Sequence, residues 1–273
     1  YILKMALTYK KYEKVLEYLP NNCNTILSLN GKARNENILK SVDNFIKLNL
    51  NGSNYLAISL SGGVDSMVLM TICKQLSIKY NFNIIGIHVN YNNRDDSVME
   101  ANFLENWCNY NDIILIRKDI TNIKRGITKR EEYESQSRNI RYSLYKKVIK
   151  KYNCPSIMLG HHKDDLSENV FNNVSRGRDL LDLSVLKPIN EIMGVIIWRP
   201  MLDLIKDIVY TYAHKYQVPY FKDTTPDWSC RGKMRRQIFP KCYDCYGKGF
   251  MKSLVDIGKQ SEEWNLVIEK LII

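Results

Sequence analysis

The sequence predicts an α/β protein built on a parallel sheet of about five strands with helices on both faces. Short apolar segments of strand length alternate with segments of helical periodicity through the middle of the chain. This alternation is typical of parallel strands joined by right-handed crossovers. Polar clusters near 61–66, 88–94 and 160–168 each follow an apolar segment. Since ligands of open α/β sheets bind at the carboxyl ends of the strands, these clusters are expected to meet at one edge of the sheet.

The individual elements follow from the same periodicity. Strands are expected at 55–60, 83–89, 112–117, 155–159 and, more briefly, 196–198. Helices are expected at 64–76, 95–110, 134–151 and 164–174. We expect a helical N-terminal extension over 1–50, an α/β domain over 51–200, and a small helical C-terminal region over 201–273.

Composition and charge narrow the class of protein. The 273 residues carry a net charge of +11, which favours a polyanionic partner such as nucleic acid. No apolar run reaches the length of a membrane span, so no membrane partner is expected. The seven cysteines are odd in number and not densely spaced, which indicates free thiols in a reducing compartment. A cytoplasmic location is therefore expected, although a chain that begins with Tyr1 leaves an organelle open.

The clearest chemical signal is the string Ser-Gly-Gly-Val-Asp-Ser at 61–66, between an expected strand and an expected helix. Glycines allow a tight turn close to a ligand, and the free N–H groups of a helix start attract phosphate. Asp65 would repel a bare anion, so its presence predicts Mg²⁺ between the carboxylate and the phosphates. A tight turn before a capped helix is the structural alternative. The expected nucleotide-binding residues are Ser61, Gly62, Gly63, Val64, Asp65 and Ser66.

Further strings follow this loop in a fixed order. They are His88-Val89-Asn90; Arg94-Asp95-Asp96-Ser97 with Glu100; Glu134, Arg138 and Arg141-Tyr142; Gly160-His161-His162-Lys163-Asp164-Asp165 with Glu168; Arg199-Pro200-Met201-Leu202; and Asp223 with Arg231, Arg235 and Pro240. The loop resembles the PP-loop of the N-type ATP pyrophosphatases, and the ordered set resembles the tRNA(Ile)-lysidine synthetase family of that superfamily. The resemblance covers roughly residues 55–240. It implies that 51–200 is the ATP-binding catalytic domain and that the region 201–273 contacts tRNA. It also implies an adenine nucleotide alpha-hydrolase-like fold, ATP and Mg²⁺ as cofactors, and tRNA(Ile) and free L-lysine as partners.

The resemblance also implies a reaction. The C2 oxygen of the wobble cytidine would attack the α-phosphate of ATP and release pyrophosphate, and the ε-amine of lysine would then displace AMP. That amine must be neutral to attack. Catalysis is assigned to Asp65, Arg138, His161 and Asp165, with Asp65 as the metal ligand and His88 and Asn90 added to the nucleotide-binding loop. Lysine or tRNA binding is assigned to Arg94, Glu134, Arg141, His162, Asp164, Glu168, Arg199, Arg231 and Arg235.

Several of these groups have structural alternatives. The Glu134, Arg138 and Arg141 series occupies one helix face and could be a solvated ion-pair face. Asp164 could cap its own helix, whereas Asp164 with Glu168 could hold a lysine ammonium or a metal ion. The two histidines suit general bases or hydrogen-bonding groups. The basic run at 231–236 could contact phosphates beside stacking aromatics, or could be an ordinary basic surface.

Departures from the family pattern keep other functions open. Asp223-Thr224-Thr225-Pro226 replaces Asp-x-Ser-Asn, and Arg231-Gly232-Lys233-Met234-Arg235 replaces Arg-Asn-x-Ile-Arg. Longer family members carry C-terminal tRNA-binding domains, so a short form or a fragment is expected here, and a homodimer is one expected assembly. Cys242 and Cys245 are expected to be free, because a zinc site needs two more ligands. The alternatives are a tRNA 2-thiolation enzyme, disfavoured by the lack of cysteine at 128–136, an ammonia-dependent synthetase, or a non-catalytic RNA-binding protein.

Overall fold

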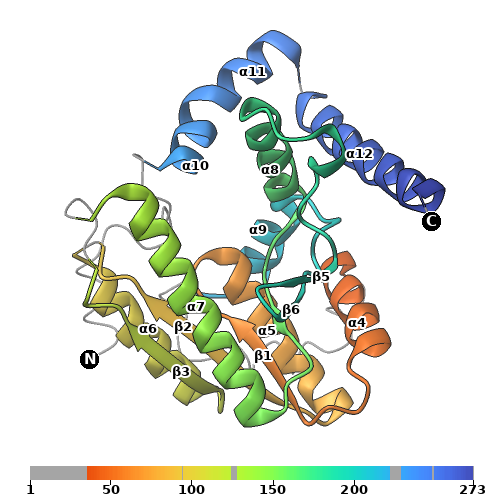
Figure 1. Cartoon of the computed structure of the whole chain (residues 1–273). Helices are drawn as coiled ribbons and strands as arrows, with labels where there is room; N and C mark the ends of the chain where they lie inside the picture. The colour runs from red at the N-terminus through yellow and green to blue at the C-terminus, as the bar shows by residue number, and fades with distance from the viewer. Residues whose placement is uncertain (1–35, 94, 124–127, 222–228, 248, 273) are drawn as a thin grey trace.

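The computed structural model describes residues 36–93, 95–123, 128–221, 229–247 and 249–272, and its centre is a six-stranded sheet (Figure 1). The strands lie in the order β3-β2-β1-β4-β6-β5. Their bounds are β1 Tyr55–Ser59, β2 Asn83–Asn90, β3 Ile114–Asp119, β4 Ile157–Met158, β5 Ile189–Ile192 and β6 Val195–Trp198. All neighbours pair in parallel except β5, which runs antiparallel to β6. The predicted fold class is confirmed.

The sheet has one strand more than the sequence predicted, because β5 forms a hairpin with β6. Its two-residue turn has positive φ at both Met193 (53°) and Gly194 (73°), as hairpin turns matching the twist of the strands do. Methionine is an unusual residue for this conformation, so the turn gave no sequence signal. Strand β3 also begins two residues later than predicted, because Asp112 has φ 50° and belongs to the preceding turn.

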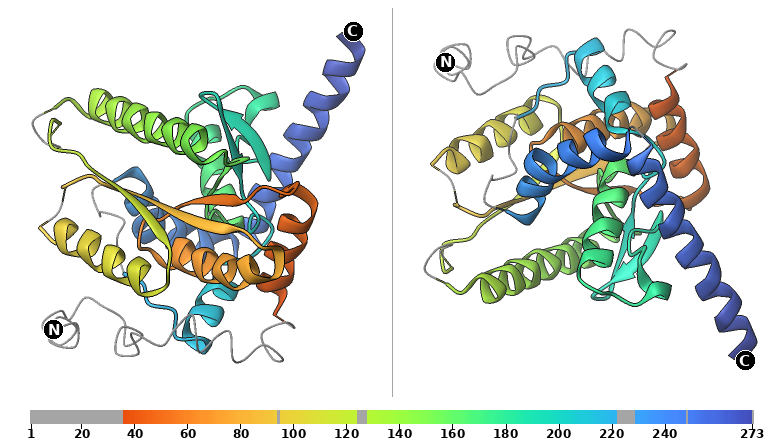
Figure 2. Two further views of the ribbon diagram at one scale, coloured as in Figure 1. Left: turned by 90° about the horizontal axis from the view of Figure 1, so that it is seen from below. Right: turned by 90° about the horizontal axis from the view of Figure 1, so that it is seen from above.

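Helices cover both faces of the sheet, as predicted. Their bounds are α4 Asn37–Asn49, α5 Val64–Tyr80, α6 Ser97–Tyr110, α7 Arg130–Tyr152, α8 Lys163–Ser175, α9 Lys206–Lys215, α10 Cys230–Lys233, α11 Phe239–Tyr246 and α12 Phe250–Ile272. Side chains from α4, α5, α6 and α9 form the main core on one face. Helix α7 packs on the other face through Tyr142, Tyr145 and Val148. Figure 2 shows this arrangement along the sheet, with α7 opposite α5 and α6.

Helix α4 is part of the main core. Its residues Ile38, Leu39, Val42 and Ile46 are buried at helical spacing and pack in the same cluster as α5 and α9. Within the predicted N-terminal extension, the stretch 36–49 therefore contributes to the α/β core, while residues 1–35 lie outside the described part of the chain. The predicted domain boundaries at 50 and 200 remain predictions.

The C-terminal helices lie beyond the carboxyl ends of the central strands. Helix α12 packs against α8 through a cluster that includes Leu166, Val170, Leu254 and Val255. Figure 1 shows α10 and α11 on the same side of the molecule as the start of α8. The segment between α10 and α11, Met234–Ile238, is a π-helix. None of the helices that the structure describes is both long and apolar enough to cross a membrane.

Candidate nucleotide-binding and catalytic site

Hydrogen bonds of Ser61 and Ser66 hold the loop between β1 and α5 in a compact turn. The backbone N–H of Ser61 donates to Ser66 Oγ at 3.1 Å, and Ser66 Oγ donates to the carbonyl of Gly63 at 3.0 Å. Gly62 has φ 84°, in the left-handed region that favours glycine. Gly63 is the N-cap of α5 and makes no side-chain cap hydrogen bond. The first N–H groups of α5 are therefore available to an anion at the positive end of the helix dipole.

The turn after β4 packs directly on this loop. A Cβ at Gly160 would lie 2.9 Å from both the carbonyl carbon and the carbonyl oxygen of Asp65, and 3.1 Å from the nitrogen of Ser66. These are backbone atoms, which cannot move aside as a flexible side chain can. Gly160 is thus required for the close approach of the second polar cluster to the loop.

Replacing Gly160 with Ala is expected to lower the unfolding free energy by about 1–3 kcal/mol, because the added methyl group overpacks the first turn of α5. The displaced loop should also bind ATP more weakly. Urea unfolding and ATP titration measure the two effects. Gly249→Ala is the matched control, since a Cβ there meets nothing within 4 Å. Equal stability and ATP affinity in both variants would contradict the proposed contact.

The Asp65 carboxylate faces an ammonium group that the sequence analysis did not identify. Lys206 Nζ, at the start of α9, lies 2.5 and 2.6 Å from the two carboxylate oxygens of Asp65. The backbone N–H of Lys206 donates to Asp164 Oδ2 at 2.8 Å. Asp164 therefore binds the start of α9, while His162 is the N-cap of α8. An isolated lysine 141 residues from its partner has no sequence signal that could have revealed it.

The single carboxylate of Asp65 suits a magnesium ion held together with phosphates. Mg²⁺ is usually bound by one or two carboxylates while substrate phosphates and water supply its other ligands. Among the residues that the structure describes, no three His, Cys, Asp or Glu side chains form a metal-binding group. The donor set at Asp65 thus fits a nucleotide-bound Mg²⁺ and does not form a protein-only metal cage.

His162 lies among three carboxylates. Its ring nitrogens are 3.6 Å from Asp65, 3.3 Å from Asp164 and 3.4 Å from Asp165, and its side chain is 1% exposed. The Asp165 carboxylate accepts from the backbone N–H of His162 at 3.0 Å, which closes a capping box at the start of α8. The predicted His-His-x-Asp-Asp element is therefore a compact structural unit next to the loop.

Two arginines from the C-terminal helices neutralise the buried acids of α8. Arg231 and Arg235 each pair with both Asp165 and Glu168; Arg231 Nε lies 2.6 Å from Glu168 Oε2, and Arg235 Nε lies 2.5 Å from Glu168 Oε1. Both acids are 5% exposed. Burial alone would raise the pKa of Asp165, but the neighbouring charge of Arg231 holds it at about 2. The sequence analysis assigned Asp165 to catalysis and Glu168, Arg231 and Arg235 to substrates, and in this structure the acids and arginines bind each other.

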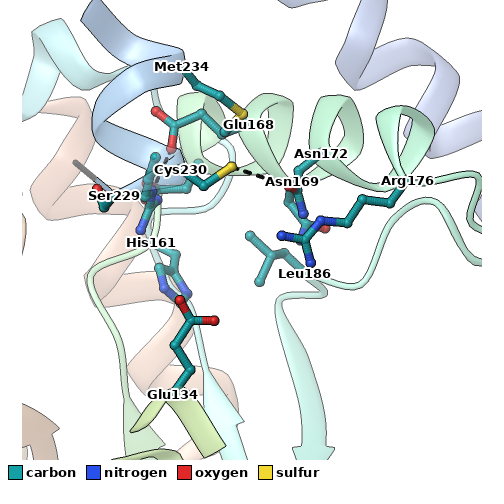
Figure 3. Close-up of a pocket in the computed structure, with 12 residues that line it drawn as sticks. Glu134, His161, Glu168, Asn169, Asn172, Arg176, Leu186, Ser229, Cys230 and Met234 are labelled. Carbon is teal, nitrogen blue, oxygen red and sulfur yellow. Dashed lines mark hydrogen bonds and ion pairs between the residues drawn. The ribbon is translucent and has the colours of Figure 1, made fainter. Parts of the chain in front are cut away.

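Two adjoining cavities border these groups. The larger has a volume of about 680 Å³. It is lined by the loop residues Ser61, Gly63, Val64, Asp65 and Ser66, by Arg138 and Arg141 of α7, and by Lys206, Arg199, Arg231 and Arg235. The smaller, of about 380 Å³, is lined in part by Glu134, Glu168, Asn169, Asn172 and Arg176. Figure 3 shows these side chains converging from α7, α8 and the 229–234 segment. His161, Asp165, Leu186 and Arg231 line both cavities.

Not every predicted site residue joins these cavities. His88 and Asn90 are buried and line neither. Asn90 donates to Asp119 Oδ1 at 2.7 Å, which connects β2 to β3. Arg94 and Asp223 lie outside the described residues. Cys242 and Cys245 are free thiols on α11. The roles assigned to individual residues remain predictions.

Comparison with known proteins identifies the family. The sequence profile described as the PP-loop domain matches residues 34–242. The tRNA(Ile)-lysidine synthase of Chlamydia felis is 31% identical over 221 residues, covering 80% of this chain and 67% of that protein. That of Chlamydia caviae is 29% identical with the same coverage. That of Enterococcus faecalis is 27% identical, covering 68% of this chain and 40% of that protein.

Among solved structures, the U34-tRNA thiolase NcsA from Methanococcus maripaludis, described with its [4Fe-4S] cluster, matches with a TM-score of 0.63 and 20% identity. The match covers 83% of this chain and 80% of that one, and shows a shared fold. The sequence relatives indicate the family within the superfamily, whereas this structural match indicates only the fold. The chain belongs to the PP-loop family and, within it, to the tRNA(Ile)-lysidine synthases.

Proposed function

We propose that the chain is an ATP-dependent ligase that joins free L-lysine to the wobble cytidine of tRNA(Ile), with Mg²⁺ as cofactor and AMP and pyrophosphate as products. One observation carries the proposal. A helix start with free N–H groups, a carboxylate suited to Mg²⁺ and a set of arginines all border one cavity of about 680 Å³. N–H donors, a bound Mg²⁺ and arginine side chains are the groups that bind a triphosphate and neutralise its charge.

The nucleotide would bind at the loop end of the larger cavity. The backbone N–H groups at the start of α5 would hold phosphate oxygens, as helix starts commonly do. Asp65 would hold Mg²⁺, which supplies positive charge to the phosphates when bound. Lys206, whose ammonium already lies against Asp65, adds a second cation at this end. Arg138 and Arg141 provide charge from the opposite wall, where both stack over Tyr142.

Lysine would bind in the smaller cavity. An amino acid fits a volume of about 380 Å³, and its ammonium groups would share Asp165 and Glu168 with Arg231 and Arg235, while Arg176 would meet its carboxylate. Asp165, with a pKa of about 2, stays ionised throughout the neutral range and would act through its charge and not as a base. His161, Asp165 and Arg231 separate the two cavities, so the amine and the activated base would meet beside them.

The remaining partners follow from charge and composition. The net charge of +11 favours approach of tRNA. The six cysteines of the described residues are all free, which supports a reducing, cytoplasmic location. The family resemblance also implies a homodimer, and analytical sedimentation would test this expectation.

Incubation with total tRNA, ATP, Mg²⁺ and labelled lysine tests the proposal. We expect label in tRNA that depends on ATP, together with an equal amount of AMP. AMP formation that depends on tRNA and a sulfur donor, with no lysine label in the tRNA, would instead support thiolation, and AMP formed without tRNA would support an ammonia-dependent synthetase. Tight tRNA binding with no AMP formation would contradict an enzymatic role and favour an RNA-binding protein.

A further inference from the structure

Arg199, which follows β6, is a buried arginine held by neutral groups. It is 1% exposed. Its Nε–H donates to His161 Nδ1 at 2.9 Å. One terminal nitrogen donates to the carbonyl of Lys187 at 2.7 Å and to Asn190 Oδ1 at 2.6 Å. No described carboxylate pairs with this guanidinium. Burial lowers the pKa of Arg199 to about 10, so it remains charged at neutral pH. Three separate partners therefore hold the group in one orientation.

This contact decides which nitrogen of His161 carries the proton. A guanidinium has only donors, so the atom that receives the Arg199 N–H must offer a lone pair. His161 Nδ1 is therefore unprotonated, and the proton of the neutral ring lies on Nε2. Placing a second proton on Nδ1 would set two N–H groups against each other. Burial lowers the pKa of His161 to about 4; the charge of Asp165 opposes this, while Arg199, Arg231 and His162 reinforce it.

The protonated Nε2 is the edge of the ring left for a substrate. Among the described residues, none hydrogen-bonds Nε2, and His161 lines both cavities. Figure 3 shows the ring between the Glu134 side and the Glu168 side of the smaller cavity. With Nδ1 bound to Arg199 and Nε2 carrying hydrogen, the ring has no free lone pair. It is able to donate a hydrogen bond but has no site at which to accept a proton.

We propose that Arg199 is a positioning residue that locks His161 in the Nε2–H form, so that His161 serves as a neutral hydrogen-bond donor to an oxygen anion and not as a general base. The acceptor is a phosphoryl oxygen of the nucleotide or adenylated base, in the chemistry of the proposed function on which this inference rests. A neutral donor of this kind stabilises developing negative charge without titrating near pH 7. Preorganisation by a buried arginine also avoids reorienting the ring during the reaction.

Nitrogen NMR of the full chain with ¹⁵N-labelled histidine tests the tautomer without any substrate. The chain has four histidines, and His161→Gln assigns the signal. We expect His161 to show protonated Nε2 and bare Nδ1 from pH 8 to pH 5. His88 is an internal control with the opposite form, because its Nδ1 lies 2.8 Å from the carbonyl of Leu60, which only accepts. A His161 signal with protonated Nδ1, or a doubly protonated ring at pH 7, would overturn the proposal.

Two further variants separate positioning from simple structural support. Arg199→Met should free Nδ1 to carry the proton, so the His161 signal should show both neutral tautomers while the His88 signal is unchanged. If Arg199→Met does not fold, the wild-type spectrum still decides the tautomer. His161→Gln retains an N–H donor and should keep the rate of AMP formation within about 10-fold, whereas His161→Leu should lose about 10²–10³-fold. Equal losses in the Gln and Leu variants would contradict a donor role.

The NMR spectrum and the lysine-transfer assay test the two proposals independently. The expected tautomer in a chain that transfers no lysine to tRNA would refute the proposed function while leaving the Arg199–His161 arrangement standing. Lysine transfer by a chain whose His161 carries its proton on Nδ1 would refute the arrangement alone.

Discussion

Replacing Asp65 with Asn is expected to reduce ATP-dependent pyrophosphate release by about 10²–10³-fold or more, while the fold stays intact. The carboxylate lines the larger cavity, and losing its charge would remove the ligand proposed for Mg²⁺. Asn has the same shape, and Asp65 and Lys206 are 28% and 21% exposed, so both groups still reach water in the variant. The unfolding free energy should therefore change by less than about 1 kcal/mol. A pyrophosphate-release assay and thermal unfolding measure the two effects.

Asp43→Asn is the matched control for this experiment. Asp43, on α4, pairs with Lys79 at 2.7 Å and is 23% exposed, so it has the same kind of partner at a similar exposure. Its position in α4 lies outside both cavities. Asp43→Asn should leave pyrophosphate release unchanged. A fully active Asp65→Asn variant would remove the metal role assigned to Asp65, and equal losses in both variants would indicate a general effect of charge.

Replacing Glu168 with Ala is expected to lower the unfolding free energy by about 2–3 kcal/mol and to abolish lysine transfer. Glu168 is buried and binds both Arg231 and Arg235, so its loss leaves two guanidinium groups beside the single carboxylate of Asp165. Breaking a fully buried ion pair costs about 3–5 kcal/mol. The arginines are 44% and 34% exposed, and partial hydration reduces that cost. Urea unfolding and labelled-lysine transfer are the measurements.

Glu262→Ala provides the comparison for stability. Glu262, on α12, pairs with Lys187 at 3.1 Å on the surface and is 35% exposed. Removing a pair of this kind should cost less than about 1 kcal/mol. If Glu168→Ala costs no more than Glu262→Ala, the acid–arginine network does not join α10 and the π-helix to α8 as described.

Much of the geometry around the 61–66 loop could be predicted from the sequence. The loop at 61–66 needed only a strand before it, glycines within it and a helix after it, and all of these are local features. The meeting of the 61–66 and 160–168 clusters followed from strand order, because parallel strands bring their carboxyl ends to the same edge. Strand β2 continues to Asn90, so His88 and Asn90 of the 88–94 cluster lie within the strand, are buried against β1 and β3, and line neither cavity.

The partners of the charged groups were decided by tertiary structure alone. The loop sequence predicted a phosphate site at Asp65, but the approach of Lys206 depends on how α9 packs against α5, 141 residues later in the chain. The same holds for Arg199 at His161 and for Arg231 and Arg235 at the α8 acids. Residue type and spacing determine what a local segment can bind. Which distant charged residue pairs with that segment depends on how the helices and strands pack together. A local sequence pattern holds no information about that packing.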